Sequence, residues 1–176
     1  MVVGTKGQSK SKEVIMGSTA KKLVAKSPCP VLAIPEESRP VDIRHIVYAS
    51  DFNKSDIAVL KKVTAFAAIY KAALTILHVF NSKRRDEEHI ITFKEQMAEE
   101  VKYDQLKYDY RMAENPDLAI ADYIRECKAD LLVMFEKSNE SLIDKLFHYD
   151  IVKQFATHTS LPLLSYNKLA LDMVEV

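Results

Sequence analysis

Short, continuously apolar runs alternate along the chain with stretches in which apolar residues recur at helical spacing. The apolar runs predict buried strands at residues 31–34, 45–49, 74–80, 131–135 and 161–166. Helical spacing predicts helices at residues 18–25, 53–70, 90–101, 117–127 and 141–157. Residues 106–112 alternate between polar and apolar, as an edge strand does. Apolar strands separated by helices are typical of a parallel sheet covered by helices on both faces.

The three glycines of the chain all lie near its beginning. Gly4, Gly7 and Gly17 form a Gly-x2-Gly-x9-Gly pattern that continues into Ser18 and Thr19. Glycine is needed where φ is positive or where a ligand approaches the main chain. A helix that begins near Ser18 would point its positive end at a bound anion. The pattern therefore predicts a phosphate-binding loop, although the Ser18 hydroxyl could equally serve only as a helix cap.

The two ends of the chain align without a gap. Placing Pro30 on Pro162, an offset of 162 − 30 = 132 residues, makes helix, proline stop and final strand coincide. The same offset replaces the glycines and Ser18 by Glu136, Asn139, Tyr149 and Asp150. Two of these replacements are acidic and would repel a phosphate. The second copy thus keeps the signal for the fold and loses the signal for anion binding.

Composition excludes several classes of function. With 25 basic and 25 acidic residues, the net charge of zero gives no basis for binding nucleic acid or an anionic membrane. No apolar run approaches the ~18 residues that span a bilayer. The five histidines lack the spacing of metal ligands, so no metal site is predicted. No nucleophile elbow or Cys-His signature predicts a catalytic residue.

These motifs resemble the universal stress protein family. Residues 1–36 match its glycine loop, helix and Pro-Val-Leu strand, and resemble the last third of one domain. Further matches are the Ala49-Ser50-Asp51-Phe52 turn after one strand and Leu77-His78-Val79 at the end of the next. The resemblance implies a tandem protein that lacks most of its first domain. Residues 1–39 would be the C-terminal fragment of that domain, and residues 40–170 a complete second domain.

The resemblance implies an α/β fold of the adenine nucleotide alpha hydrolase type. Its five-stranded parallel sheet would have the strand order 3-2-1-4-5 and helices on both faces, with an N-terminal β-α-β remnant of the preceding repeat. In family members that bind ATP, the residues that correspond to Asp51 and Val79 of this sequence lie on the adenosine side. Gly4, Gly7, Gly17, Ser18 and Thr19 correspond to the phosphate side. Because these two groups belong to different repeats, no single repeat has a complete site.

The expected function is a cytoplasmic stress-response module for binding or interaction, with a degenerate nucleotide site in the complete domain. It is expected not to be an enzyme and to have no certain cofactor. Its expected partner is a second copy, in a homodimer or oligomer formed by pairing of the last strand and the N-terminal segment. We expect neither nucleic acid nor membrane as a partner. Weaker alternatives are a flavodoxin-like module and a small adenylyl-transfer enzyme. The sequence lacks the phosphate loop after the first strand that the former needs, and it lacks the motifs typical of the latter.

Three arrangements of the N-terminal segment stay open. In the first, its last strand pairs with residues 161–166 and no nucleotide binds. In the second, its glycine loop completes an ATP site with Asp51 and Val79, in the same chain or in a swapped neighbour. In the third, the segment is disordered or the pocket takes another ligand. Asp51 could also be only a helix cap, and Val79 only part of the core.

Overall fold

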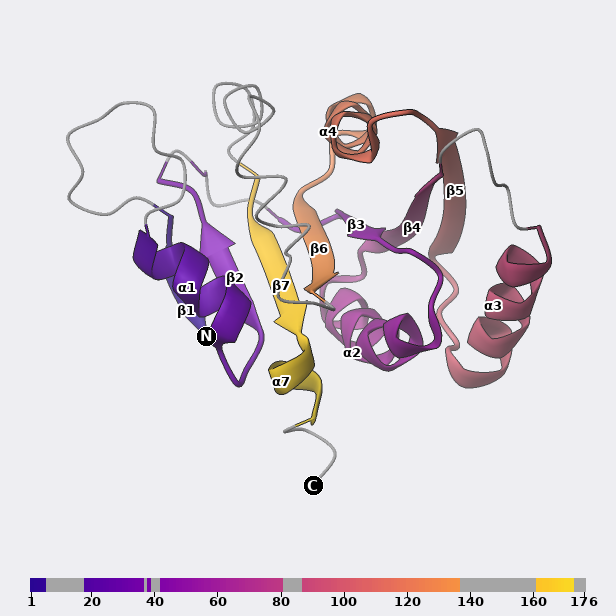
Figure 1. Ribbon diagram of the computed structural model, residues 1–176, viewed down its shortest axis with the longest axis horizontal. Coiled ribbons are helices and arrows are strands. Elements are labelled where there is room, and N and C mark those ends of the chain that lie inside the picture. The colour runs from indigo at the N-terminus through magenta and orange to yellow at the C-terminus, as the bar shows by residue number, and fades with distance from the viewer. Residues whose placement is uncertain (6–17, 37, 39–41, 81–86, 137–160, 173–176) are drawn as a thin grey trace. The chain divides into compact units, whose positions relative to one another are not determined.

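The chain folds into two compact units of mixed helix and strand. Figure 1 shows a computed structural model that describes residues 1–5, 18–36, 38, 42–80, 87–136 and 161–172. Unit 1 combines Met1–Val41 with Leu131–Val176, and unit 2 comprises Asp42–Asp130. Across the described ranges, no helix is long and apolar enough to cross a bilayer.

The strands of unit 1 are β1 (Val2–Gly4), β2 (Val31–Ile34), β6 (Leu131–Glu136) and β7 (Leu163–Asn167), and its helices are α1 (Ser18–Lys26) and α7 (Lys168–Asp172). The strands of unit 2 are β3 (His45–Ala49), β4 (Ala73–Phe80) and β5 (Leu106–Met112), and its helices are α2 (Lys54–Tyr70), α3 (Glu87–Glu100) and α4 (Pro116–Cys127).

The strands of unit 1 run in the order β1-β2-β7-β6. β1 is parallel to β2 and β6 is parallel to β7, whereas β2 runs antiparallel to β7 with Leu32 opposite Leu164. Helix α1 packs on β2 and β7, and α7 continues directly from β7 (Figure 1). Val24 of α1 and Val31 of β2 are buried in this core. The N-terminal and C-terminal segments therefore fold together.

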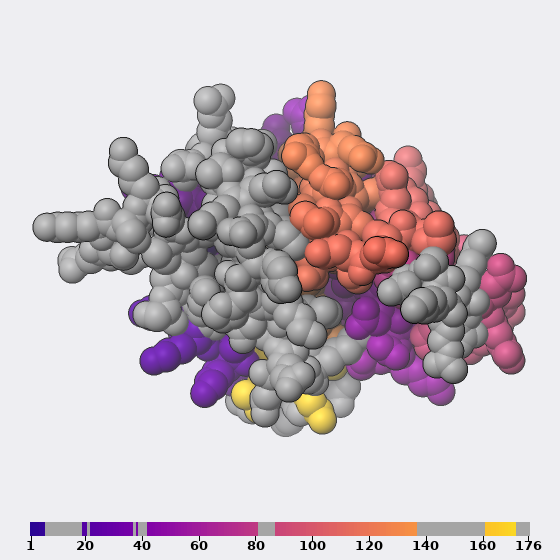
Figure 2. All heavy atoms as spheres, turned by 45° about the horizontal axis from the view of Figure 1, so that its top comes forward, coloured from indigo at the N-terminus to yellow at the C-terminus, as the bar shows by residue number. Residues whose placement is uncertain are grey.

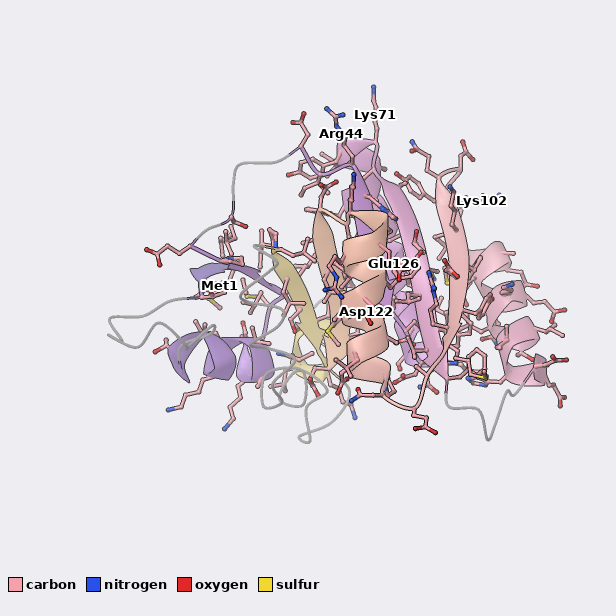
Figure 3. The ribbon with its side chains drawn as sticks, turned by 90° about the horizontal axis from the view of Figure 1, so that it is seen from above. Met1, Arg44, Lys71, Lys102, Asp122 and Glu126 are labelled. Atoms are coloured by element: carbon pink, nitrogen blue, oxygen red, sulfur yellow. The ribbon has the colours of Figure 1, made fainter. Side chains whose placement is uncertain are left out.

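Unit 2 has the order β3-β4-β5, and all its pairs are parallel. Phe93 of α3 packs on one face of this sheet through Phe52, which contacts Tyr108 and Tyr110 of β5. On the other face, Tyr123 of α4 contacts residues of β4 and β5. The outer side of α4 is open to solvent in Figure 2, and Figure 3 shows Asp122 and Glu126 there.

Two helices of unit 2 end without the glycine that usually occupies the position after a helix. Lys71 after α2 and Lys128 after α4 have φ values of 53° and 52°, in the left-handed region. An L-residue with a Cβ adopts this region at a cost of roughly 1 kcal/mol. The chain has no glycine beyond Gly17, so lysine fills both positions.

The structure confirms an α/β fold and corrects its details. The described residues contain seven strands in mixed directions, whereas we expected a five-stranded parallel sheet with a remnant. The antiparallel step arises because β2 and β7 are joined by no direct crossover, which is what enforces parallel strands. Pairing of the N-terminal segment with the last strand is confirmed. The order 3-2-1-4-5 would also require β3 beside β6, which stays a prediction.

The described residues leave two further predictions untested. The division into repeats at residues 1–39 and 40–170 follows the sequence, and the two compact units do not test it. The helix predicted at residues 141–157 lies outside the described residues. A short helix that the periodicity did not predict, α7, follows the last strand.

Candidate functional site

Asp51 and Val79 lie at the carboxyl ends of two neighbouring parallel strands. Ala49 pairs with Leu77 in the register, and the Ser50 amide donates a hydrogen bond to the Leu77 carbonyl at 2.9 Å. Asp51 is exposed and Val79 is half-buried. The structure thus brings together the two residues predicted for the adenosine side. The helix cap is Asn53, so the alternative interpretation of Asp51 as the cap is wrong.

A buried carboxylate beside this edge was missed by the sequence reasoning. Asp56 is fully buried in α2 and accepts hydrogen bonds from the Tyr48 hydroxyl at 3.0 Å and the Ser50 hydroxyl at 2.8 Å. It also accepts one from the Asn53 amide at 3.1 Å. The signal was available, because Asn53-x-x-Asp56 has the spacing of a capping box. Asp56 therefore fixes the turn that carries Asp51.

Phe52 fills the space beneath that turn. Its φ of 59° is unusual for a residue with a side chain, and its ring is fully buried. The ring stacks between His78 and Phe93, with both centroid distances at 4.5 Å. The His78 Nδ1 atom lies 2.8 Å from the Ser50 carbonyl oxygen. Aromatic packing therefore holds the strand end rigidly, and backbone strain is balanced by burial.

Lys94 completes this aromatic cluster from α3. Its Nζ atom lies 5.1 Å from the ring centroid of Tyr108 and 4.9 Å from that of Tyr110, both within cation–π range. Burial, followed by the proximity of Tyr110, raises the pKa of Tyr108. The Tyr110 hydroxyl is buried and makes no hydrogen bond within the described part of the chain.

A second polar network lies on the opposite face of the unit 2 sheet, under α4. The Tyr123 hydroxyl lies near the side chains of Asp109 and Thr75, which act on its pKa in opposite directions. Thr75 Oγ1 lies 2.9 Å from His45 Nε2, and His45 Nδ1 lies 3.2 Å from the Cys127 carbonyl oxygen. Burial raises the pKa of Tyr123 to about 12, and its interaction with Asp109 adds to that rise. The network links β3, β4, β5 and α4.

Only part of the predicted phosphate loop is described. Gly4 ends β1 and is exposed, and the next residue, Thr5, is buried with its amide bonded to the Ile34 carbonyl at 3.0 Å. Gly7 and Gly17 lie outside the described residues. Ser18 begins α1, as the helical spacing predicted, and Thr19 is exposed.

The equivalent strand of the second copy ends differently. Glu136 is the last residue of β6 and is 6% exposed, whereas its counterpart Gly4 lies open at the end of β1. Its neighbour in the register is Asn167 of β7. The replacements of the other loop positions, Asn139, Tyr149 and Asp150, lie outside the described residues. The strand end of the second copy therefore has a buried glutamate where the first has an exposed glycine.

Asn167 joins three elements of unit 1. Its side-chain amide donates hydrogen bonds to the carbonyls of Val24 at 3.2 Å and Ser27 at 2.9 Å, near the end of α1. Its side-chain oxygen accepts one from the Ala170 amide at 2.8 Å. All these groups would otherwise be orphaned at helix ends. A single buried side chain thus holds α1, β7 and α7 together.

The predicted site residues belong to two different units of the fold. Gly4, Ser18 and Thr19 belong to unit 1, whereas Asp51 and Val79 belong to unit 2. Among the described residues, no group of three or more His, Cys, Asp and Glu side chains could hold a metal ion.

Comparison with known proteins gives a sequence match at one end of the chain and fold matches over most of it. Residues 1–35 match the profile described as the universal stress protein family. The search of curated proteins found no match.

Solved structures match most of the chain. A universal stress protein from Archaeoglobus fulgidus DSM 4304 matches with a TM-score of 0.67 at 18% identity, over 95% of this chain and 62% of its own. A protein from Pseudomonas aeruginosa UCBPP-PA14 assigned to the same family matches with a TM-score of 0.63 at 17% identity, over 99% of this chain and 66% of its own. The chain therefore spans less than two thirds of the length of these two proteins.

A third structure, a universal stress protein in complex with cAMP, matches with a TM-score of 0.53 at 16% identity. The match covers 72% of this chain and 98% of that one. At such identities the likeness concerns the fold alone, which is the α/β fold of these proteins.

Proposed function

We propose, from the confirmed resemblance of this chain to the universal stress protein family, that it is a stress-response binding and interaction module whose second repeat holds no nucleotide. The role is one of association, in the cytoplasm, and not of catalysis. Its partners would be copies of itself or other universal stress domains. The cytoplasmic location and the absence of catalysis are expectations that follow from the family.

The observation that carries this proposal is the buried carboxylate of Glu136. It stands at the strand end where the first copy has Gly4, and it would lie where phosphate oxygens approach the backbone. Two negative groups held at close range repel strongly when water is excluded.

A second candidate is an ATP-binding protein with a composite site. The glycine loop of residues 4–17 would hold the phosphates, and Asp51 and Val79 would line the adenosine side. Two observations favour it: these last two residues share one sheet edge, and a protein of the same fold has been solved with cAMP. It requires the two groups to meet within one chain or between two chains.

Thermal unfolding with millimolar Mg-ATP, and separately with cAMP, tests the two candidates. A bound nucleotide raises the unfolding temperature by mass action, and ligand at 100 times its dissociation constant adds about 2.7 kcal/mol of stability. We expect no shift from either nucleotide.

Two variants identify the site if a shift appears. A shift lost in Gly4→Glu and kept in Glu136→Gln would favour the composite site. A shift that responds to Glu136→Gln and not to Gly4→Glu would overturn the proposal, because the second repeat would then hold the nucleotide. Gly4→Ala is the matched control, since it adds a side chain without charge.

A further inference from the structure

We propose that the outer faces of α2 and α3 form a self-complementary surface, on which α2 of one copy of this chain lies against α3 of a second copy. This inference rests on the proposed role as an interaction module and names the surface that serves it. It does not depend on nucleotide binding, and all the residues that carry it belong to unit 2.

The two helices lie side by side on one face of the unit 2 sheet. β3, β4 and β5 are parallel neighbours in chain order, so right-handed crossovers through α2 and α3 place both helices on the same face. Figure 1 shows them on one side of these strands and α4 on the other. The Lys61 Nζ atom lies 2.5 Å from the Glu100 Oε2 atom, which joins the two helices directly. Their outer sides therefore form one continuous face.

The outer side of α2 is basic. Its buried side is centred on Leu60 and Val63. At helical spacing, the opposite side carries three lysines, an alanine and an isoleucine: Lys54, Lys61, Lys62, Ala65 and Ile69. Asp56 is the only acidic residue of α2, and it is fully buried. The helix thus presents positive charge and no carboxylate to solvent.

The outer side of α3 is acidic. Phe93 and Met97 are buried on its inner side. The opposite side carries three glutamates around an exposed isoleucine: Glu88, Ile91, Glu95 and Glu99. Lys94 is the only lysine or arginine of α3, and its Nζ atom lies over a ring of β5, 4.9 Å from the Tyr110 centroid. The outer side of α3 therefore has the charge opposite to that of α2.

These charges are available to a partner. Within the described part of the chain, no ion pair involves Lys54, Lys62, Glu95 or Glu99. A charge that is already paired has less to gain from a new partner, whereas these four side chains gain the full attraction of an opposite charge. The surface consequently favours a partner of complementary charge.

Each helix also carries an exposed apolar side chain among its charges. Ile69 is 77% exposed and Ile91 is 56% exposed, and Ile69 is the most exposed large apolar side chain of the described residues. The small Ala65, one turn before Ile69, lets a facing helix approach closely. Contact with another helix would remove both isoleucines from water, which adds an apolar contribution to the pairing of charges.

A second copy of this chain supplies the complementary charges in the right arrangement. A two-fold axis that runs parallel to the helices, between the two molecules, places each basic α2 on the acidic α3 of the other copy. Every attractive contact then occurs twice. An arrangement with α2 on α2 would instead oppose like charges, which costs free energy.

The extent of the surface sets the strength of the dimer. α2 has 17 residues and α3 has 14, so the helix pair is roughly 20 to 25 Å long and about 20 Å wide. A face of roughly 400 Å² per copy is at the low end for specific interfaces. The dimer should consequently be weak, depend on concentration and respond to salt.

Sedimentation equilibrium of the full chain tests the surface. We expect a monomer–dimer equilibrium at about 0.01 M salt that weakens by about tenfold at about 1 M, where the screening length falls from roughly 30 Å to 3 Å. Lys54→Glu with Lys62→Glu, the acidic α2 variant, should weaken the dimer by about tenfold, because like charges then face each other. Lys107→Glu with Lys128→Glu is the matched control. It changes the net charge equally at exposed residues outside this surface, so it should weaken the dimer far less.

A mixture of two variants tests which helix meets which. Glu95→Lys with Glu99→Lys, the basic α3 variant, should weaken the dimer as the acidic α2 variant does. Mixing these two variants in equal amounts should restore association, because acidic α2 then meets basic α3 and the native helices meet on the other side of the axis. Mixing the basic α3 variant with the Lys107→Glu, Lys128→Glu control, which has the same net charge as the acidic α2 variant, should restore much less.

Three results would each overturn the proposal: a monomer at both salt concentrations, a dimer that the acidic α2 variant leaves unchanged, or equal rescue by the control variant. A dimer unchanged by both helix variants would leave the role in association in place and assign it to another surface. None of these substitutions alters Gly4 or Glu136, so failure of this surface and binding of nucleotide by the second repeat are distinguishable.

Discussion

Unit 1 and unit 2 finish their parallel strands in opposite ways. In unit 2, β3 runs into a turn that is held by a buried carboxylate and by a stack of aromatic rings around Phe52. In unit 1, β1 ends in an exposed Gly4 with no described atom near its Cβ position. Rigid packing suits a strand end that presents a side chain, whereas bare backbone suits one that meets a ligand or another chain. The two halves of the predicted site thus have different physical characters.

The largest expected effect is in the turn of unit 2. Asp56→Ala removes the acceptor of three hydrogen bonds, from Tyr48, Ser50 and Asn53, and should lower the free energy of unfolding by about 3 kcal/mol. Denaturant titration gives the loss, and hydrogen exchange should show more opening in unit 2 than in unit 1. Asp56→Asn keeps one acceptor oxygen and should lose less. Equal opening of both units would show that Asp56 does not stabilise unit 2 selectively.

In unit 1 the corresponding anchor is Asn167. Asn167→Ala leaves the carbonyls of Val24 and Ser27 and the amide of Ala170 without their partner, which should cost about 2 kcal/mol of stability. The opening should appear by hydrogen exchange in α1 and α7. Asn167→Asp keeps the acceptor for Ala170 and loses both donors, so α1 should still open. Protection of α1 that is unchanged in Asn167→Ala would remove Asn167 from its assigned role.

Alkaline pH should lower the stability of unit 2 through the polar network under α4. Tyr123 has its pKa raised from about 10 in the unfolded chain to about 12 in the folded one. The folded state therefore holds its proton more tightly, and stability that is fully present below pH 10 should be lost as the pH rises towards 12. Denaturant unfolding measured across this range provides the test. Tyr123→Phe should flatten this part of the profile, and a slope unchanged in that variant would count against the assignment.

The smallest expected effect concerns the left-handed helix ends of unit 2. Lys71→Gly and Lys128→Gly should each stabilise the protein by about 0.5 kcal/mol, because glycine adopts a positive φ without steric cost and this gain exceeds its greater unfolded-state entropy. Thermal unfolding gives the measurement. Lys71→Ala is the matched control, as it removes the charge and keeps the Cβ, so it should not stabilise. A gain in the alanine variant equal to that of glycine would mean that charge, not backbone conformation, is the cause.

Sequence alone determined the features that depend on local order. The periodicity located β2, β3 and β5 with their observed bounds, because burial of a strand or helix face imposes a repeat on neighbouring residues. Pairing of the N-terminal segment with the last strand was one of three arrangements that the sequence left open, and the structure shows it. The glycine spacing led to the resemblance, because it is a pattern within neighbouring residues that needs no tertiary contact to be recognised.

Tertiary structure alone decided which distant groups meet. The antiparallel step from β2 to β7 and the links from Asn167 to α1 join residues by contact rather than by spacing along the chain. The same holds for Tyr123, whose pKa is raised by burial between α4 and the sheet and by Asp109 of β5. Local sequence fixes periodicity, whereas hydrogen bonds between distant residues form only once the chain has folded.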